Sequence, residues 1–222
     1  DGDLYGSKIE GTVNTFKDNN YYKLELKGNS EGPFSSILRL TNLNQTFEVE
    51  EDSGEHYTNF YFISPLSSTM DLLGKNSNLV LNTKIKDGNF NNKKTELKFS
   101  DLYSSIEYDS TNGVKEGFAT ININNIPVQL DIKKGKEKGK FNTQITTEDV
   151  FSAQRILSSF NIKKEINGSS KFNIKLTLPS FIKEDPLIDP EIEVLSNLEG
   201  ISINLPEPLM KSKNSKVNFR LT

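Results

Sequence analysis

Apolar and polar residues alternate along most of the 222-residue chain, the pattern of β-strands with one buried and one solvated face. The clearest run spans residues 172–178, where four apolar residues share one side. Residues 126–132 alternate in the same way, and shorter runs recur from residue 23 to residue 221. The pattern predicts an all-β chain whose strands each have a dry and a wet face.

Glycine-containing pairs separate many of these runs and are typical of tight turns between antiparallel strands. The predicted turns are Asp87-Gly88, Asn112-Gly113, Lys134-Gly135, Lys138-Gly139 and Asn167-Gly168. Short connections of this kind favour a mainly antiparallel sheet.

Two short segments have helical rather than alternating spacing. Residues 148–160 place five apolar residues on one side, with Thr146 or Thr147 as the N-cap. Residues 67–73 form a shorter candidate, which Gly74 is suited to end. We therefore expect one or two short helices beside the strands.

A sheet with one apolar face has to cover that face, because burying a Leu or Ile side chain contributes about 1.5–3 kcal/mol. Two short helices cannot cover every predicted strand. The remaining alternatives are a facing sheet, which would make a two-sheet sandwich, and the acyl chains of lipid. The residue pattern alone leaves both alternatives open.

Composition narrows the classes of function. The formal charge of -3 provides no basic field for a phosphate backbone, so we expect no nucleic-acid partner. The absence of cysteine excludes disulfides and thiol catalysis. We interpret residues 1–222 as one β-rich segment of a longer protein, with two sub-units, 1–66 and 67–222, as the alternative division.

Candidates for catalysis or metal binding are few. The single histidine, His56, ends an acidic run that starts at Glu50, and we predict a solvated loop there. Neither an EF-hand spacing nor a second histidine for a zinc site is present. Five lysines in residues 133–140 predict a soluble hairpin tip, with attraction to anionic lipid headgroups as the alternative. We expect a non-enzymatic protein with no catalytic residue, metal or cofactor.

One stretch of motifs resembles a known family. A strand ending at Leu178-Pro179 is followed, after a Pro-containing connection, by Ser196-Asn197-Leu198-Glu199-Gly200 and by Leu205-Pro206-Glu207-Pro208-Leu209-Met210-Lys211. Their order resembles the YhdP branch of the large AsmA-like proteins, in which "S-x-L-x-G" precedes "L-P-x-P-L-x-K". Upstream, Asn125-Ile126-Pro127-Val128 is similar to a further segment of that branch, although an Asn-Gly pair would be more usual there.

The resemblance implies a fold and a function. AsmA-like proteins are anchored in the bacterial inner membrane by an N-terminal helix, extend through the periplasm, and are implicated in moving phospholipid to the outer membrane. Their strongly curved sheets form an open apolar groove. By this resemblance, acyl chains would contact the apolar side chains Leu24, Leu26, Leu81, Ile121, Ile123, Val128, Leu130, Phe172, Ile174, Leu176, Leu178, Ile201, Ile203 and Leu205. The alternative is a β-sandwich adhesion or interaction module that functions through loops such as residues 50–56.

Overall fold

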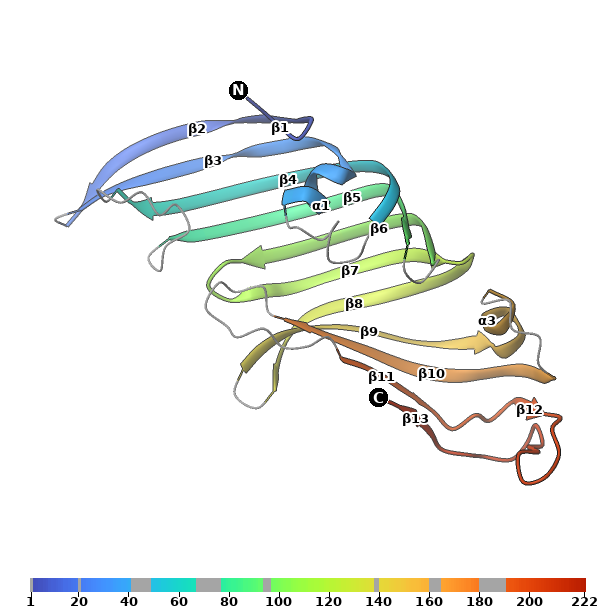
Figure 1. Ribbon diagram of the computed structural model, residues 1–222. Helices are drawn as coiled ribbons and strands as arrows, with labels where there is room; N and C mark the ends of the chain where they lie inside the picture. The colour runs from blue at the N-terminus through green and yellow to red at the C-terminus, as the bar shows by residue number, and fades with distance from the viewer. Residues whose placement is uncertain are drawn as a thin grey trace.

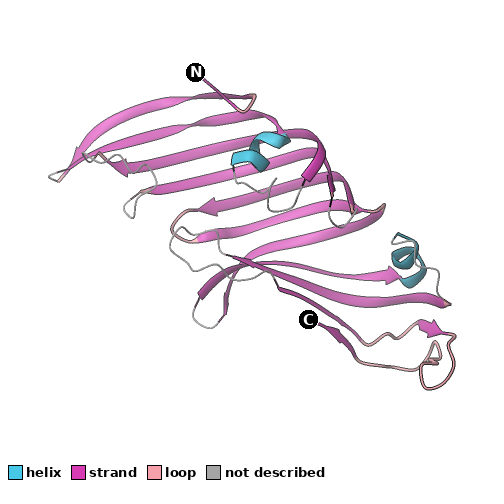
Figure 2. Ribbon diagram, viewed as in Figure 1, coloured by secondary structure: helices cyan, strands magenta, loops and turns pink. Residues whose placement is uncertain are grey.

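The computed structural model describes residues 2–19, 21–40, 49–66, 77–93, 97–137, 140–159, 165–179 and 191–222. Within these ranges the chain is mainly antiparallel β-sheet with two short helices (Figures 1 and 2). This confirms the predicted fold class at that level. The sheet is not closed, because it runs from β1 at one edge to β13 at the other.

The elements follow one another along the chain with long strands in the middle. The first strands are β1 (Gly2–Leu4), β2 (Ser7–Asp18), β3 (Tyr21–Pro33), β4 (Val49–Pro65), β5 (Asn78–Asn92) and β6 (Lys98–Asp109). The later ones are β7 (Gly113–Ile123), β8 (Ile126–Glu137), β9 (Lys140–Ser152), β10 (Ile166–Pro179), β11 (Glu191–Ser196), β12 (Ile201–Ile203) and β13 (Phe219–Leu221). Helix α1 (Phe34–Leu40) follows β3, and helix α3 (Ala153–Ser159) follows β9.

Strand order follows chain order from β1 to β11, after which β13 pairs with β11 and β12 with β10. Tight turns explain this order. Gly113, with φ of 75°, connects β6 to β7 as predicted for Asn112-Gly113. Asn124 and Asn125 connect β7 to β8 with φ of 47° and 63°, the two positive values that a type I′ turn requires. All the pairings between described strands are antiparallel.

Three of the predicted turns are wrong because the glycine lies inside a strand. Asp87-Gly88 lies within β5, where the register against β6 shifts and Asp87 has φ of 53°, so the pair forms a β-bulge. Lys134-Gly135 lies in β8, where a Cβ on Gly135 would be 2.1 Å from Asn142 Oδ1. Asn167-Gly168 lies in β10, and Gly168 has φ of 102°. Lys138-Gly139 falls outside the described residues.

The helices also differ from the prediction. Residues 148–152 continue β9 and pair with β10, so α3 begins only at Ala153. The Ser152 hydroxyl accepts a hydrogen bond from the Arg155 amide at 3.4 Å, which makes Ser152 the N-cap in place of Thr146 or Thr147. The predicted helix at 67–73 falls outside the described residues. Helix α1 was not predicted.

The described strands form one sheet, and this overturns the two-sheet sandwich for the described part of the chain. Both helices lie on the same face of that sheet (Figure 1). The alternative division of the chain into 1–66 and 67–222 falls between β4 and β5. These two strands pair directly, from Val49 with Asn92 to Ile63 with Asn78, so the sheet is continuous across that point.

Candidate functional site

The strand register places most of the predicted lipid-contacting residues on one face of the sheet. Residues that pair across antiparallel strands point to the same side. Ile121 pairs with Val128, Ile132 with Ile145, and Ile145 with Leu176, and similar pairs continue across the sheet. We call this side the apolar face. It holds the predicted residues Leu24, Leu26, Leu81, Ile121, Ile123, Val128, Leu130, Phe172, Ile174, Leu176 and Leu178.

The last three predicted residues lie apart from this central run. Ile201 and Ile203 belong to β12, which pairs with Gly168 and Ile166 at the start of β10 and bridges to Lys211 through Ile203. Leu205 follows the end of β12 and is in no strand, so the predicted strand at 201–205 is shorter than expected. Pro206 and Pro208 lack the amide hydrogen needed to extend a strand ladder.

The apolar face is buried where the helices cover it. Phe34 and Leu38 of α1 pack on Ile85, a group that we call the α1 cluster. Ile121, Val128 and Phe151 form a second buried group, the α3 cluster, which Ile156 of α3 contacts. Its other half-buried neighbours are Phe90, Phe99, Leu102, Ile123, Ile126, Leu130, Phe172 and Ile174.

Aromatic rings join the two clusters. Phe90 packs against both, with its ring centroid 6.0 Å from that of Phe34 and 4.5 Å from that of Phe99. The Phe90 and Phe99 rings are stacked, with an interplanar angle of 12°. The buried core is therefore continuous between α1 and α3.

Other parts of the apolar face lie outside both clusters. Leu24, Leu26 and Leu81 belong to neither cluster and remain half-buried. Val13 of β2, which pairs with Leu26, is 68% exposed. Among these residues Val13 is the exposed one, whereas Phe62, which pairs with Leu26 on the same face, is buried.

A chain of hydrogen-bonded side chains interrupts the apolar face near α1. The Ser7 hydroxyl lies 2.8 Å from His56 Nε2, and His56 Nδ1 lies 3.2 Å from the Thr58 hydroxyl. The Thr58 hydroxyl is in turn 3.1 Å from that of Thr83. Gly32 of β3 pairs with His56 and lies next to Ser7. Because Gly32 has no side chain, it leaves room for the Ser7–His56 contact. We call these four side chains the polar chain.

His56 therefore does not lie in a solvated loop, and that prediction is wrong. It is part of β4 and only 4% exposed. Its burial is tolerated because Ser7 and Thr58 provide hydrogen-bond partners for both ring nitrogens. Burial lowers the pKa of its imidazole below the ordinary value of 6.5. The imidazole is thus neutral at pH 7.

The Ser7–His56 pair has the spacing of a nucleophile and its base but not their surroundings. Ser7 is 2% exposed, which keeps its hydroxyl from a substrate. The group on the other ring nitrogen is the Thr58 hydroxyl rather than a carboxylate. Within the described ranges, no group of three His, Asp or Glu residues could hold a metal ion. The polar chain fits a role in holding β2, β4 and β5 together.

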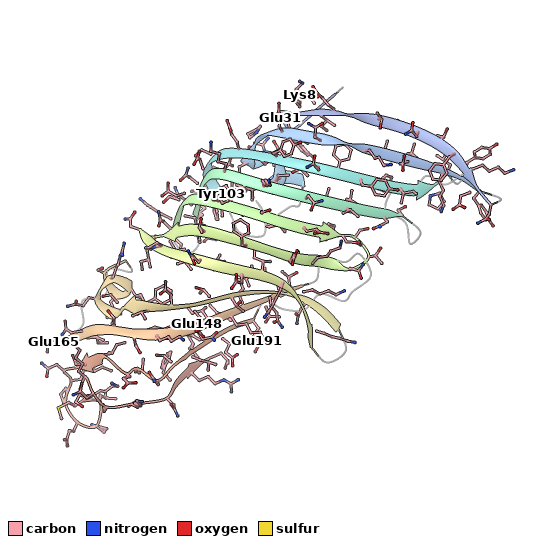
Figure 3. All side chains as sticks on the ribbon, turned by 180° about the vertical axis from the view of Figure 1, so that it is seen from behind. Lys8, Glu31, Tyr103, Glu148, Glu165 and Glu191 are labelled. Carbon is pink, nitrogen blue, oxygen red and sulfur yellow. The ribbon has the colours of Figure 1, made fainter. Side chains whose placement is uncertain are left out.

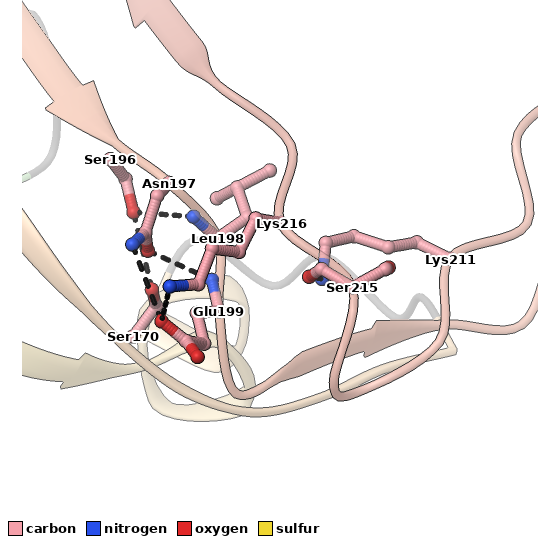
Figure 4. Close-up of polar contacts among 8 residues, drawn as sticks. All are labelled: Ser170, Ser196, Asn197, Leu198, Glu199, Lys211, Ser215 and Lys216. Carbon is pink, nitrogen blue, oxygen red and sulfur yellow. Dashed lines mark hydrogen bonds and ion pairs between the residues drawn. The ribbon is translucent and has the colours of Figure 1, made fainter.

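The family-like motifs form the turn that follows β11 (Figure 4). The Ser196 hydroxyl donates to the Lys171 carbonyl at 2.7 Å and accepts from the Leu198 amide at 3.0 Å. Leu198 and Gly200 have φ of 52° and 91°. The Lys211 side chain is buried and donates to three carbonyls, those of Ile201 at 2.9 Å, Ser212 at 3.1 Å and Ser215 at 2.7 Å. Each of these residues shapes the turn, a role that the sequence pattern did not reveal.

Ion pairs follow the opposite face, which is seen in Figure 3. Lys115 pairs with Glu107 at 2.5 Å, Lys171 with Glu148 at 2.5 Å, and Arg220 with Glu193 at 2.8 Å. The predicted wet face is therefore present. It also carries exposed aromatic side chains, Tyr57, Tyr103 and Phe118, which sequence reasoning missed.

The described residues of the lysine-rich segment 133–140 lie in strands β8 and β9. Residues 133–137 pair in register with residues 140–144 of β9, so this part of the segment is strand rather than the predicted tip, and residues 138–139 lie outside the described ranges. The acidic, proline-containing connection around residues 184–190 is outside them too.

Comparison of the chain with protein-family models, curated proteins and solved structures finds no match. In the described part of the chain, no helix is both long and apolar enough to cross a membrane.

Proposed function

We propose that this chain is a non-enzymatic segment that carries phospholipid, with the acyl chains lying along the apolar face as in a groove. In the complete protein, the segment would belong to a periplasmic bridge between inner and outer membrane. The observation that carries the proposal is the register, which aligns eleven predicted contact residues on one side of one sheet.

The partial covering of that face supports the same function. The two clusters bury part of the face under α1 and α3, whereas Leu24, Leu26 and Val13 lie beyond them. Covering exposed apolar surface contributes about 25 cal/mol per Å². An acyl chain supplies such cover without directional contacts, so it can be exchanged along the face.

The test compares a charge on the apolar face with one on the opposite face of a neighbouring strand. Leu26→Asp places a carboxylate among the apolar residues, and Thr12→Asp places one on the other face, opposite Lys27. Each purified protein is incubated with phosphatidylethanolamine vesicles and separated from them, and the bound phospholipid is measured by mass spectrometry.

We expect Leu26→Asp to lose most of the bound phospholipid and Thr12→Asp to retain the wild-type amount. Circular dichroism checks that both variants are folded. Lipid-free wild-type protein, or equal lipid on the two folded variants, would contradict the proposal. If Leu26→Asp fails to fold, Val13→Asp replaces it, since Val13 lies on the same face at an exposed position.

A further inference from the structure

The face opposite the apolar face carries a row of side chains aligned across six strands. Lys8 of β2 pairs with Glu31, Glu31 with Tyr57, and Tyr57 with Lys84. Lys84 then pairs with Ser105, and Ser105 with Phe118 of β7. Because paired residues point to one side, these six side chains project together. Figure 3 shows Lys8, Glu31 and Tyr103 on this side of the molecule.

The aromatic members of this region are exposed. Tyr103 and Phe118 are 46% and 45% exposed, and their ring centroids are 6.0 Å apart. Tyr57 is 41% exposed, and its hydroxyl donates to Asn59 Oδ1 at 3.1 Å, which restrains the ring. Tyr57 and Phe118 lie three strand spacings apart, roughly 14 Å. Three aromatic rings are therefore presented on one nearly continuous surface.

A depression of about 930 Å³ lies beside these rings, and its lining includes Lys8, Glu31, Glu55, Tyr57, Lys84 and Tyr103. Its volume is within the range of small-molecule sites. Lys84 and Glu55 form no ion pair with any other described residue. Within the described residues, an ammonium and a carboxylate without an ion pair therefore lie next to the rings.

We propose that this surface binds an extended oligosaccharide. Sugar rings have apolar C–H faces that stack on aromatic side chains, and their hydroxyls accept from an ammonium and donate to a carboxylate. A purely apolar partner would bury the charges of Lys84 and Glu55, which is costly. The lining carries charges of both signs, from Lys8, Lys84 and Lys86 and from Glu31 and Glu55, so it has no single-sign field that would select a polyanion. The combination of rings with charges of both signs favours a ligand that is apolar on its faces and polar at its edges.

The proposal is tested with tetrasaccharides of β-1,4-linked N-acetylglucosamine and of β-1,4-linked glucose, titrated to millimolar concentration and followed by NMR chemical shifts. We expect saturable binding of at least one of them. Tyr103→Ala and Phe118→Ala should each weaken it about tenfold, the effect of losing one aromatic contact. The control is Tyr21→Ala, because Tyr21 is also an exposed tyrosine, 69% exposed, but lies at the other end of β3 and outside the depression.

Absence of binding to either tetrasaccharide would overturn the proposal, as would binding that Tyr103→Ala and Phe118→Ala leave unchanged. This result is separate from the lipid test. Tyr103 and Phe118 lie on the face away from the lipid candidates, so both variants should bind wild-type amounts of phospholipid. A glycan result in either direction therefore leaves the lipid proposal to its own experiment.

Discussion

The two covered regions of the apolar face are built from different contacts. Beside the α1 cluster, the polar chain joins Ser7, His56, Thr58 and Thr83 through directional hydrogen bonds. In the α3 cluster, the side chains from β7, β8 and β9 that face one another are apolar. Apolar contacts depend mainly on volume, whereas hydrogen bonds depend on distance and angle. The α1 region should therefore be sensitive to small displacements, and the α3 region to lost volume.

Removing side-chain volume from the α3 cluster should lower the free energy of unfolding more than the other changes considered. Ile121 is buried at its centre, so Ile121→Ala should lower the free energy of unfolding by about 2–5 kcal/mol through lost burial and a cavity. Urea denaturation followed by circular dichroism measures the change. Val13→Ala, at an exposed position of the same face, should change it by less than about 0.5 kcal/mol. Equal losses in the two variants would show that the α3 cluster is not a stabilising core.

Moving Ser7 away from His56 in the polar chain should lower the free energy of unfolding by an intermediate amount. A Cβ on Gly32 would lie 2.6 Å from both the Cα and the Oγ of Ser7, so Gly32→Ala should separate Ser7 from His56. We expect a loss of about 1–3 kcal/mol, the usual cost of overpacking. Gly2→Ala is the matched control, since a Cβ there has nothing within 4 Å. A Gly32→Ala protein as stable as Gly2→Ala would mean that the Ser7–His56 contact is dispensable.

Acidification should lower the stability of the protein through the polar chain and not through the α3 cluster, and this change should be the smallest of the three. The pKa of His56 is lowered in the folded state, so the unfolded chain binds more protons as the pH falls below 6.5. The stability that comes from neutral His56 is complete above pH 6.5 and is lost as the pH falls through the lowered pKa. Urea midpoints at pH 7.5 and 5.5 measure this loss. His56→Gln should remove this part of the pH dependence, whereas Ile121→Ala should retain it.

The sheet could be predicted from the sequence because alternation also fixes which side each residue faces. Once Leu176 and Ile145 are on the apolar face, every second residue of β10 and β9 follows. Eleven lipid candidates were thus placed together without knowledge of the register. The alternation did not reveal how long each strand would be, and this is why Asp87-Gly88 and Lys134-Gly135 were mistaken for turns.

The helices and the polar chain were harder to predict, because they depend on contacts between distant strands. Glu148 and Asp149 suit a helix start, but Thr147 and Phe151 continue the strand and face β10. Helix α1 has a local signal that could have found it, since Phe34, Ile37 and Leu38 are spaced as on one helical face. No local signal places Ser7 beside His56, which is 49 residues away. The acidic residues before His56 instead suggested solvent.

The strand order also determines how this molecule could change in length. From β1 to β11, each strand is hydrogen-bonded to the strands that precede and follow it in the chain. A hairpin added to or removed from the series would leave the remaining pairs with their own neighbours, as in repeat proteins. The length of such a sheet could therefore change in steps of two strands, and the apolar residues of every strand would still lie on one face.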